Sequence, residues 1–302
     1  MEFLYLLEKI RMPGLNEFML GITYLGDEIA FLVIALMVFW CVDKRSGYYL
    51  MSVGFVGTVT SQFMKLACRI PRPWVRDPNF TILEAAREGA GGYSFPSGHS
   101  QSSVGTFGSI ARTTKRPWVR WLCIAAAVLV PFSRMYIGVH TPADVLVGSA
   151  ISLVLVFALH PLVFREDGRG MKWLIPAMLA MALGYLLYVE LATFPADVDA
   201  HNLASGQKNA YTLLGCTIGV AVVYPAERRF VNFRTDAVWW AQILKIVLGL
   251  ALVMLVKEGM KVPLEALLSP LPARMVRYFL VVAAAGLIWP MSFQYFSKLG
   301  RK

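Results

Sequence analysis

Residues 133–163 read SRMYIGVHTPADVLVGSAISLVLVFALHPLV, a polar segment that runs directly into an apolar one. The apolar part, which we predict as a helix over residues 143–164, is long enough to cross a bilayer, because a spanning helix needs about 20 mostly apolar residues. Thr141-Pro142-Ala143-Asp144 favours a helix start, with Thr141 as the N-cap and Asp144 reaching back to it. The polar segment therefore lies where a membrane helix begins.

Further apolar segments extend this pattern over the chain, which is 57% hydrophobic and 16% charged and has a mean hydropathy of +0.57. A soluble domain is rarely so apolar. We therefore expect an all-α, polytopic transmembrane helical bundle of about nine spans, with short and uncertain members at the first, third and seventh positions. Besides 143–164, the predicted spans cover residues 28–43, 47–66, 99–113, 117–136, 171–190, 210–225, 237–256 and 275–296.

We expect three parts along the chain. Residues 1–22 are apolar but interrupted by charges, which is typical of an interfacial amphipathic helix; a polar-interrupted first crossing is the alternative. Residues 23–165 would form the catalytic membrane core, and residues 166–302 a C-terminal transmembrane extension of about four crossings. Within the extension, Gly215 and Gly219 are four residues apart, a spacing that favours close contact between helices.

Three short polar motifs fall at the ends of the first five predicted spans and point to phosphate binding. A phosphate is best held by cations and by backbone N–H groups at a helix start. Gly98 would let the backbone approach such an anion closely, and its neighbours suit a tight turn into a helix. The motifs are Lys65-x6-Arg72-Pro73, Pro96-Ser97-Gly98-His99 and Ser133-Arg134-x5-His140-x3-Asp144, whose cations are Lys65, Arg72 and Arg134.

The histidines of these motifs add reactive groups. One neutral imidazole can attack phosphorus, and a second can protonate the leaving oxygen. If the segment is helical, Asp144 can lie over His140, accept its second ring N–H and fix the attacking tautomer. Asp144 also has a purely structural interpretation in the capping box, but the upstream Ser133-Arg134 and the spacing to His140 favour the functional one. The four cysteines and four histidines show no metal-binding or disulfide spacing, so we expect no metal and no cofactor.

The order and spacing of the motifs resemble those of the type 2 phosphatidic acid phosphatase superfamily, the lipid phosphate phosphatases, over about residues 20–165. The resemblance implies a metal-independent, two-step hydrolysis in which His140 is the nucleophile and a phosphohistidine forms. It further implies that Asp144 orients His140 and that His99 is the general acid. The residues that it assigns to phosphate binding are Lys65, Arg72, Ser97, Gly98 and Arg134.

The expected substrate is a lipid, because a phosphate site at the ends of membrane helices faces the headgroup layer. Candidate substrates are a polyprenyl diphosphate such as undecaprenyl diphosphate, phosphatidic acid, phosphatidylglycerol phosphate and a sphingoid-base phosphate. The segment Gly138–Asp144 is similar to that of lipid-directed members of the family. Two alternatives stay open: a glucose-6-phosphatase-like enzyme acting on a soluble sugar phosphate, and a lipid transporter or scramblase on a phosphatase scaffold. The transporter hypothesis predicts an eroded site, whereas every motif residue is present.

Charge predicts the orientation. The net charge is +10, and in the predicted topology this whole excess lies on the face opposite the motifs. Lys and Arg favour cytoplasmic loops, so we expect a multi-pass protein with an extracytoplasmic site, outside a bacterial plasma membrane or inside a eukaryotic organelle lumen, and a cytoplasmic C-terminus. The expected partners are the bilayer and a membrane lipid substrate, not nucleic acid; the sequence leaves a homo-oligomer open.

Two further features have competing interpretations. The loop of residues 67–98 is long for a membrane connection, and its Trp74 and Phe80 predict either a lid over the site or an anchor in the membrane interface. Lys245 falls inside the predicted span of residues 237–256, where we expect it to extend towards the cytoplasmic surface.

Overall fold

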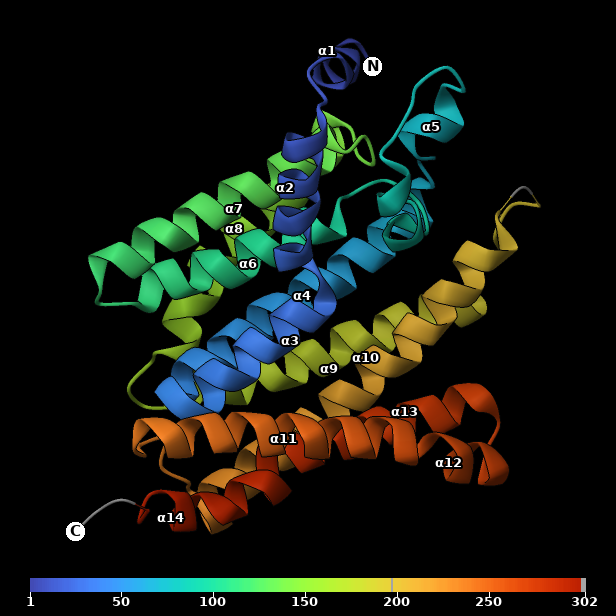
Figure 1. The fold of residues 1–302 in the computed structure, drawn as a ribbon. Coiled ribbons are helices and arrows are strands. Elements are labelled where there is room, and N and C mark those ends of the chain that lie inside the picture. The colour runs from blue at the N-terminus through green and yellow to red at the C-terminus, as the bar shows by residue number, and fades with distance from the viewer. Residues whose placement is uncertain (197, 300–302) are drawn as a thin grey trace. The chain divides into compact units, whose positions relative to one another are not determined.

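The computed structural model describes residues 1–196 and 198–299, and the regular elements in these ranges are all helices (Figure 1). The predicted all-α class is therefore confirmed. The α-helices are α1 Glu2–Lys9, α2 Pro13–Thr23, α3 Glu28–Met37, α4 Lys44–Cys68, α5 Pro73–Arg76, α6 Gly98–Thr113, α7 Pro117–Tyr136, α8 Pro142–Val163, α9 Arg169–Leu191, α10 Ala200–Ala226, α11 Trp239–Gly259, α12 Lys261–Leu267, α13 Pro270–Ala283 and α14 Phe293–Phe296.

The predicted number of nine spans is not confirmed. Among the described residues, six helices are long and apolar enough to cross a membrane, and a seventh span results if Pro13–Gly26 and Glu28–Val42, which meet at 56°, are one broken crossing. The predicted segments 47–66 and 99–113 do form helices, α4 and α6, but neither is among the six. The physical reason is clearest in α6, which has only 16 residues and buries a row of serine and threonine side chains inside the protein.

The N-terminal region contains two helices, α1 and α2, in place of the single amphipathic helix that we expected over residues 1–22. The apolar face of α1 packs on the protein, because Leu4 forms a buried cluster with Phe80 and Ile82. Phe80 therefore does not act as an interfacial anchor. The interfacial position of this region remains a prediction.

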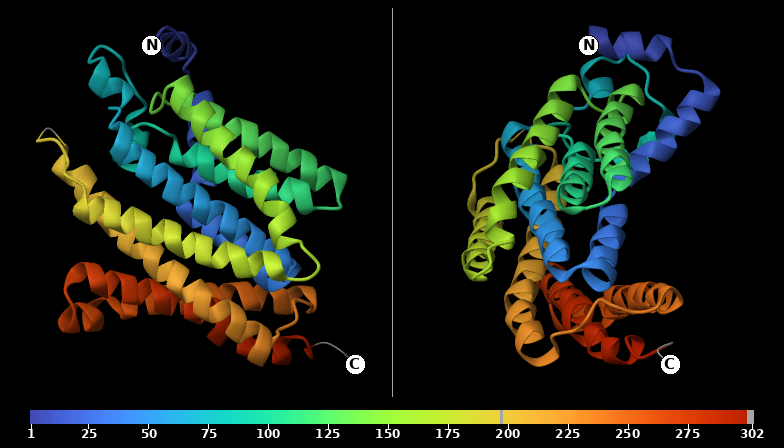
Figure 2. Two further views of the ribbon diagram at one scale, coloured as in Figure 1. Left: turned by 180° about the vertical axis from the view of Figure 1, so that it is seen from behind. Right: turned by 90° about the vertical axis from the view of Figure 1, so that its left-hand side faces the viewer.

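Two compact units make up the chain, and the first contains every predicted site residue. It comprises Met1–Ile34, Tyr49–Pro161 and Pro195–Leu203, and the second unit comprises the remainder. In the first unit, α6 and α7 lie side by side (Figures 1 and 2). A Cβ atom on Gly148 of α8 would lie 2.5 Å from the Ser97 carbonyl oxygen. Glycine at position 148 thus allows α8 to approach the beginning of α6.

The second unit confirms the predicted glycine contact. Cβ atoms on Gly215 and Gly219 of α10 would lie 2.1 Å from the Met275 carbonyl oxygen and 2.8 Å from Val282, both in α13. Only glycine permits helices to pack this closely.

Lys245 in α11 does not extend to the surface as we expected. It is fully buried, and its Nζ donates to the carbonyl oxygens of Trp40, at 2.9 Å, and Thr235, at 3.1 Å, and lies 4.2 Å from the centre of the Phe293 ring. Trp40 lies near the end of its helix, where carbonyl groups lack partners within the helix. These contacts satisfy the ammonium group inside the protein.

Candidate active site

The helix ends of the first unit position the three motifs. Lys65 lies in the last turn of α4, Ser97 is the N-cap of α6 and Arg134 lies in the last turn of α7. His140 lies in the connection between α7 and α8, where the Ser97 N–H donates to the Asp144 carbonyl oxygen at 2.9 Å. The structure thus brings the second and third motifs into direct contact.

His140 is buried and has a partner on each ring nitrogen. Its Nε2 lies 2.8 Å from Arg72 Nη1, and its Nδ1 lies 3.4 Å from Asp144 Oδ2. Because a guanidinium only donates hydrogen bonds, Nε2 must be the unprotonated nitrogen, and the ring proton is on Nδ1 facing the carboxylate. Burial, followed by the positive charges of Arg72, Arg134 and Lys65, lowers the pKa of His140 well below its usual value. The imidazole is therefore neutral, with its lone pair on Nε2.

Asp144 makes the contacts that both of its predicted functions require. Its Oδ2 accepts from the Thr141 N–H at 2.8 Å, and its own N–H donates to Thr141 Oγ1 at 3.3 Å, which completes the capping box of α8. The same Oδ2 faces His140 and accepts from Ser94 Oγ at 2.6 Å. Ser94 was not among the predicted site residues, because a lone serine before the second motif has no recognisable pattern.

Arg72 is buried and connects two loops. Its Nη2 donates to Gly91 O at 2.7 Å, its Nε to Gly92 O at 3.0 Å and its Nη1 to Val139 O at 3.0 Å. Burial lowers the pKa of Arg72 to about 10, although the negative charge of Asp144 acts in the opposite direction. The guanidinium therefore remains charged at neutral pH and holds His140 in place.

Two other cations lie in the same region of the first unit. Lys65 Nζ donates to the Tyr93 carbonyl oxygen at 2.7 Å. Arg134 is buried and donates from Nη1 to Thr23 Oγ1 at 2.8 Å, but its Nε and Nη2 have no hydrogen-bond partner. Unpaired donors on a buried charged group are costly. An anion that met both nitrogens of the planar guanidinium would remove this cost.

Open space adjoins the start of α6. A Cβ atom on Gly98 would have no heavy atom within 4 Å, other than those of its chain neighbours and its own helix. Ser97 Oγ accepts from the Ser100 N–H at 3.4 Å and from Ser100 Oγ at 2.9 Å, so the Ser97 side chain caps the helix. An anion beside Gly98 would meet the positive end of the α6 dipole.

His99 has a partner that our sequence analysis did not identify. Its Nε2 lies 2.6 Å from Oδ1 of Asp27, at the break before α3. A Cβ atom on the adjacent Gly26 would lie 3.0 Å from the His99 carbonyl oxygen, which shows how closely this break approaches α6. The only signal in the sequence was Gly-Asp before an apolar run, which also marks an ordinary helix start.

Within the described residues, 1–196 and 198–299, no group of three or more His, Cys, Asp and Glu side chains could hold a metal ion. The candidate site is a neutral, oriented imidazole beside the buried cations Arg72 and Arg134. Such an arrangement can attack phosphorus and stabilise the negative charge of a phosphate.

Comparison with known proteins identifies the family. The PAP2 superfamily model matches residues 45–167, and the model described as PAP2 superfamily phosphatase, transmembrane extension, matches residues 211–302. The chain belongs to the PAP2 superfamily, which confirms the resemblance seen in the motifs, and it is a multi-pass membrane member.

The relatives of this chain include phosphatases that are named for different lipids. Mouse sphingosine-1-phosphate phosphatase 1 is 26% identical over 294 residues, which cover 90% of this chain and 66% of the mouse protein. Phosphatidylglycerophosphatase B of Bacillus subtilis is 30% identical over 161 residues, covering 49% of this chain and 75% of that protein. Undecaprenyl-diphosphatase of Sulfolobus acidocaldarius is 29% identical over 149 residues, covering 49% of this chain and 70% of that protein. No solved structure matches the chain.

Proposed function

We propose that this protein is an integral membrane lipid phosphatase that hydrolyses a phosphomonoester or diphosphate through a phosphohistidine at His140. The observation that carries the proposal is the state of this side chain: it is buried, its Nδ1 faces Asp144 Oδ2 at 3.4 Å, and its Nε2 lone pair faces the Arg72 guanidinium at 2.8 Å. A nucleophilic imidazole needs a free lone pair, and a phosphate needs cations beside that lone pair.

The first chemical step forms the phosphohistidine. The Nε2 lone pair of His140 attacks phosphorus, the bond between phosphorus and the leaving oxygen breaks, and His99 gives its proton to that oxygen. In the second step water attacks phosphorus, the N–P bond breaks with its electron pair returning to Nε2, and His99 takes the proton of the water. Bound phosphate accepts the Arg72 hydrogen bond that Nε2 accepts in the free protein.

Phosphate binding uses the groups that lack partners in the free protein. Arg134 offers Nε and Nη2, and Gly98 leaves space at the positive end of α6. Lys65 adds charge from the α4 end, while Ser97 shapes the turn. This set stabilises the negative charge that the equatorial oxygens carry in the transition state, and no step requires a metal.

Asp27 positions the general acid. Its Oδ1 lies 2.6 Å from Nε2 of His99. The other ring nitrogen, Nδ1, is therefore the one that can donate a proton to the leaving oxygen. Burial lowers the pKa of His99, and the hydrogen bond and negative charge of Asp27 act in the opposite direction, so Asp27 favours the protonated imidazole that the first step requires.

A lipid substrate fits the location of the site at helix ends, where the tail stays in the bilayer during hydrolysis. Relatives named for sphingosine 1-phosphate and undecaprenyl diphosphate support this class. The positive-inside rule supports an extracytoplasmic site, with the C-terminus in the cytoplasm.

The test is phosphate release by the purified protein in detergent with chelator present, using polyprenyl diphosphate, phosphatidic acid, phosphatidylglycerol phosphate, sphingoid phosphate and glucose 6-phosphate. We expect lipid hydrolysis that is lost in His140→Ala, and an acid-labile, alkali-stable phosphoprotein after rapid quenching of the wild type. Release from glucose 6-phosphate alone would support the sugar phosphatase alternative. Lipid movement without phosphate release would support a transporter, and turnover that persists in His140→Ala would refute the assignment.

A further inference from the structure

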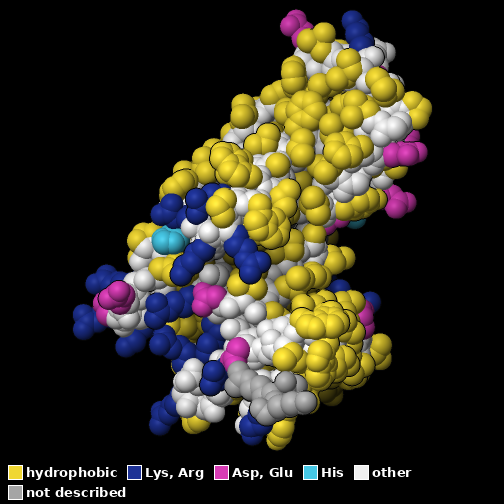
Figure 3. Space-filling model, turned by 60° about the vertical axis from the view of Figure 1, so that its left-hand side comes forward, with side chains coloured by type: hydrophobic (Ala, Val, Ile, Leu, Met, Phe, Trp, Pro, Cys, Tyr) yellow, Lys and Arg dark blue, Asp and Glu magenta, His cyan; other side chains and the backbone are white. Residues whose placement is uncertain are grey.

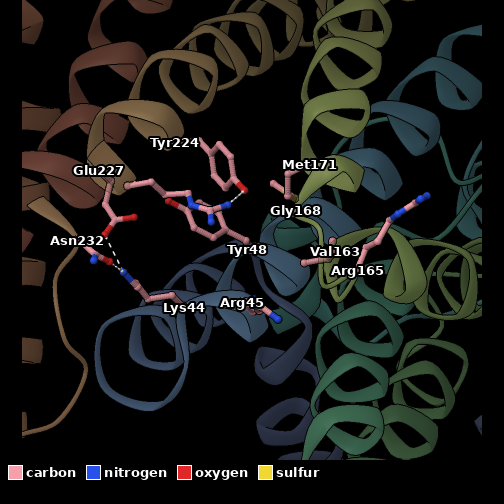
Figure 4. A pocket seen from close by; sticks show the side chains of 11 residues that line it. Lys44, Arg45, Tyr48, Val163, Arg165, Gly168, Met171, Tyr224, Glu227 and Asn232 are labelled. Atoms are coloured by element: carbon pink, nitrogen blue, oxygen red, sulfur yellow. Dashed lines mark hydrogen bonds and ion pairs between the residues drawn. The ribbon is translucent and has the colours of Figure 1, made fainter. Parts of the chain in front are cut away.

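The second unit contains a cavity of about 170 Å³ that the catalytic proposal does not use. The start of α4, the connection between α8 and α9, and the end of α10 surround it (Figure 4). Lys44, which lines it, is the first residue of α4, whereas Lys65 of the candidate active site lies in the last turn of that helix. The cavity is therefore a separate feature.

Positive charge dominates the lining of this cavity. Lys44, Arg45, Arg165 and Arg228 contribute cations, and Glu227 contributes the carboxylate. Glu227 is buried, and its Oε1 pairs with Lys44 Nζ at 3.0 Å. The face of the molecule drawn in Figure 3 shows a dense group of Lys and Arg side chains, with hydrophobic side chains over most of the rest.

Two of these cations have no carboxylate partner among the described residues. Arg228 Nη1 donates to the Tyr224 hydroxyl at 2.7 Å and lies over that ring, which leaves its charge uncompensated. Arg45 has no ion pair in the described part of the chain, whereas Arg165 pairs with Asp167 at 2.9 Å. Arg45 and Arg228 are thus available to an anion.

Two buried polar atoms of the lining lack hydrogen-bond partners: the Tyr48 hydroxyl and Glu227 Oε2. In Figure 4 the hydroxyl end of Tyr48 is directed to the Glu227 side of the cavity. An unsatisfied buried group costs free energy and calls for an explanation. A ligand with acceptor oxygens and a hydroxyl donor would satisfy both atoms, since the tyrosine donates and the carboxylate accepts.

We propose that this cavity binds a phosphate-bearing anion that also carries a hydroxyl group, and that the headgroup of an anionic phospholipid is its source. The phosphate oxygens accept from Arg45, Arg228 and the Tyr48 hydroxyl, and the ligand hydroxyl donates to Glu227 Oε2. The volume fits a headgroup better than a single water, whose share of liquid volume is about 30 Å³. The cavity lies where α8 ends and α9 begins, and ends of spanning helices meet the headgroup layer, where basic clusters attract anionic lipids.

Binding to the delipidated full-length protein, followed by native mass spectrometry and by the shift in melting temperature, tests this proposal. All variants carry His140→Ala, so that no added phosphate ester is consumed. The ligands are phosphatidylglycerol, phosphatidylcholine, glycerol 3-phosphate and inorganic phosphate. Arg45→Gln/Arg228→Gln removes two exposed charges of the cavity, and Lys115→Gln/Arg116→Gln removes two exposed charges from the connection between α6 and α7.

We expect Arg45→Gln/Arg228→Gln to raise the Kd for phosphatidylglycerol at least tenfold, and the control to change it less than twofold. Tyr48→Phe should also weaken binding while leaving the melting temperature of the delipidated protein unchanged or higher, because it removes an unsatisfied hydroxyl. A Kd for glycerol 3-phosphate equal to that for phosphatidylglycerol would overturn the phospholipid as the source and assign the anion site to a soluble ester. Equal Kd values for phosphatidylcholine and phosphatidylglycerol, or equal losses in both double variants, would overturn the proposal. Since no outcome depends on turnover, a failure here is distinct from a failure of the proposed phosphatase activity.

Discussion

Replacing Asp27 by asparagine keeps the shape of the side chain and removes the charge that faces His99. The wild-type contact joins Asp27 Oδ1 to His99 Nε2 at 2.6 Å. If His99 donates the proton to the leaving group, the substitution lowers its basicity and makes the protonated form scarcer. The expected defect is therefore confined to the step in which the leaving oxygen needs a proton.

The size of the effect follows from the geometry. A hydrogen bond to a charged group contributes about 1.5–3 kcal/mol. The Asp27 side chain is 39% exposed and that of His99 18% exposed, so water screens the pair and the lower end, about 1.5 kcal/mol, applies. Since each 1.36 kcal/mol corresponds to about tenfold in rate, kcat should fall about tenfold.

The assay compares two leaving groups. A lipid phosphate releases a poor leaving group that needs the acid, whereas p-nitrophenyl phosphate releases a good one that does not. Asp27→Asn should therefore lower kcat about tenfold on the lipid phosphate and much less on the aryl phosphate. Glu28→Gln removes the neighbouring exposed carboxylate and serves as the matched control, for which we expect unchanged rates.

Two results would refute this reasoning. Equal losses of kcat on both substrates would mean that Asp27 supports the fold and not the proton transfer. A further loss on combining Asp27→Asn with His99→Asn would mean that Asp27 acts independently of His99, because residues that act as one unit give non-additive effects.

Three other predictions test the site and the fold. Arg134→Gln should lower kcat/KM about 100-fold, because it removes the Nε and Nη2 donors that are unpaired in the free protein. Its cost to the melting temperature should be that of the single hydrogen bond from Nη1 to Thr23 Oγ1. An unchanged kcat/KM would remove Arg134 from phosphate binding. The pKa of His140 is lowered, so its imidazole should stay neutral below pH 6.5 in ¹⁵N NMR spectra, assigned with His140→Asn. The unfolded chain takes up this proton near pH 6.5 and the folded protein does not, so the free energy of unfolding should decrease as the pH falls below that value. The decrease should be less steep in His140→Asn. Equal dependence on pH in the wild type and the variant would contradict a buried neutral imidazole. Gly215→Leu should destabilise the protein by about 1–3 kcal/mol in thermal unfolding, because its Cβ position lies 2.1 Å from the Met275 carbonyl oxygen, whereas Gly184→Leu, with open space around the same position, should have little effect.

Features that follow from a local pattern with one physical meaning could be predicted from the sequence. The Thr141–Asp144 capping box begins α8 as predicted, and the glycine pair of α10 makes the predicted close contact with α13. The number of spans was less predictable, because hydropathy does not distinguish a polar helix buried in protein, such as α6, from one in water.

Long-range partners were missed for a related reason. Asp27 and Ser94 meet the motif residues only through the fold, from 72 and 50 positions away along the chain. Lys245 behaved unexpectedly because its carbonyl partner Trp40 becomes available only at the end of a distant helix. Chemistry that depends on a single contact between distant residues leaves no local signal.

The hydrogen bond from the Ser97 N–H to the Asp144 carbonyl oxygen, at 2.9 Å, joins the main chain two residues before His99 to the main chain four residues after His140, the two histidines of the proposed mechanism. The distance between the proposed acid and the proposed nucleophile is then set by the backbone, and nearby side-chain substitutions should change it little. If relatives named for different lipids share this hydrogen bond, the distance between acid and nucleophile would be the same in all of them. Their different substrate preferences would then arise from the residues that contact the lipid tail and the alcohol. The search for the determinants of lipid selectivity should therefore begin in the loop of residues 67–98 and in α1 and α2, not among the motif residues.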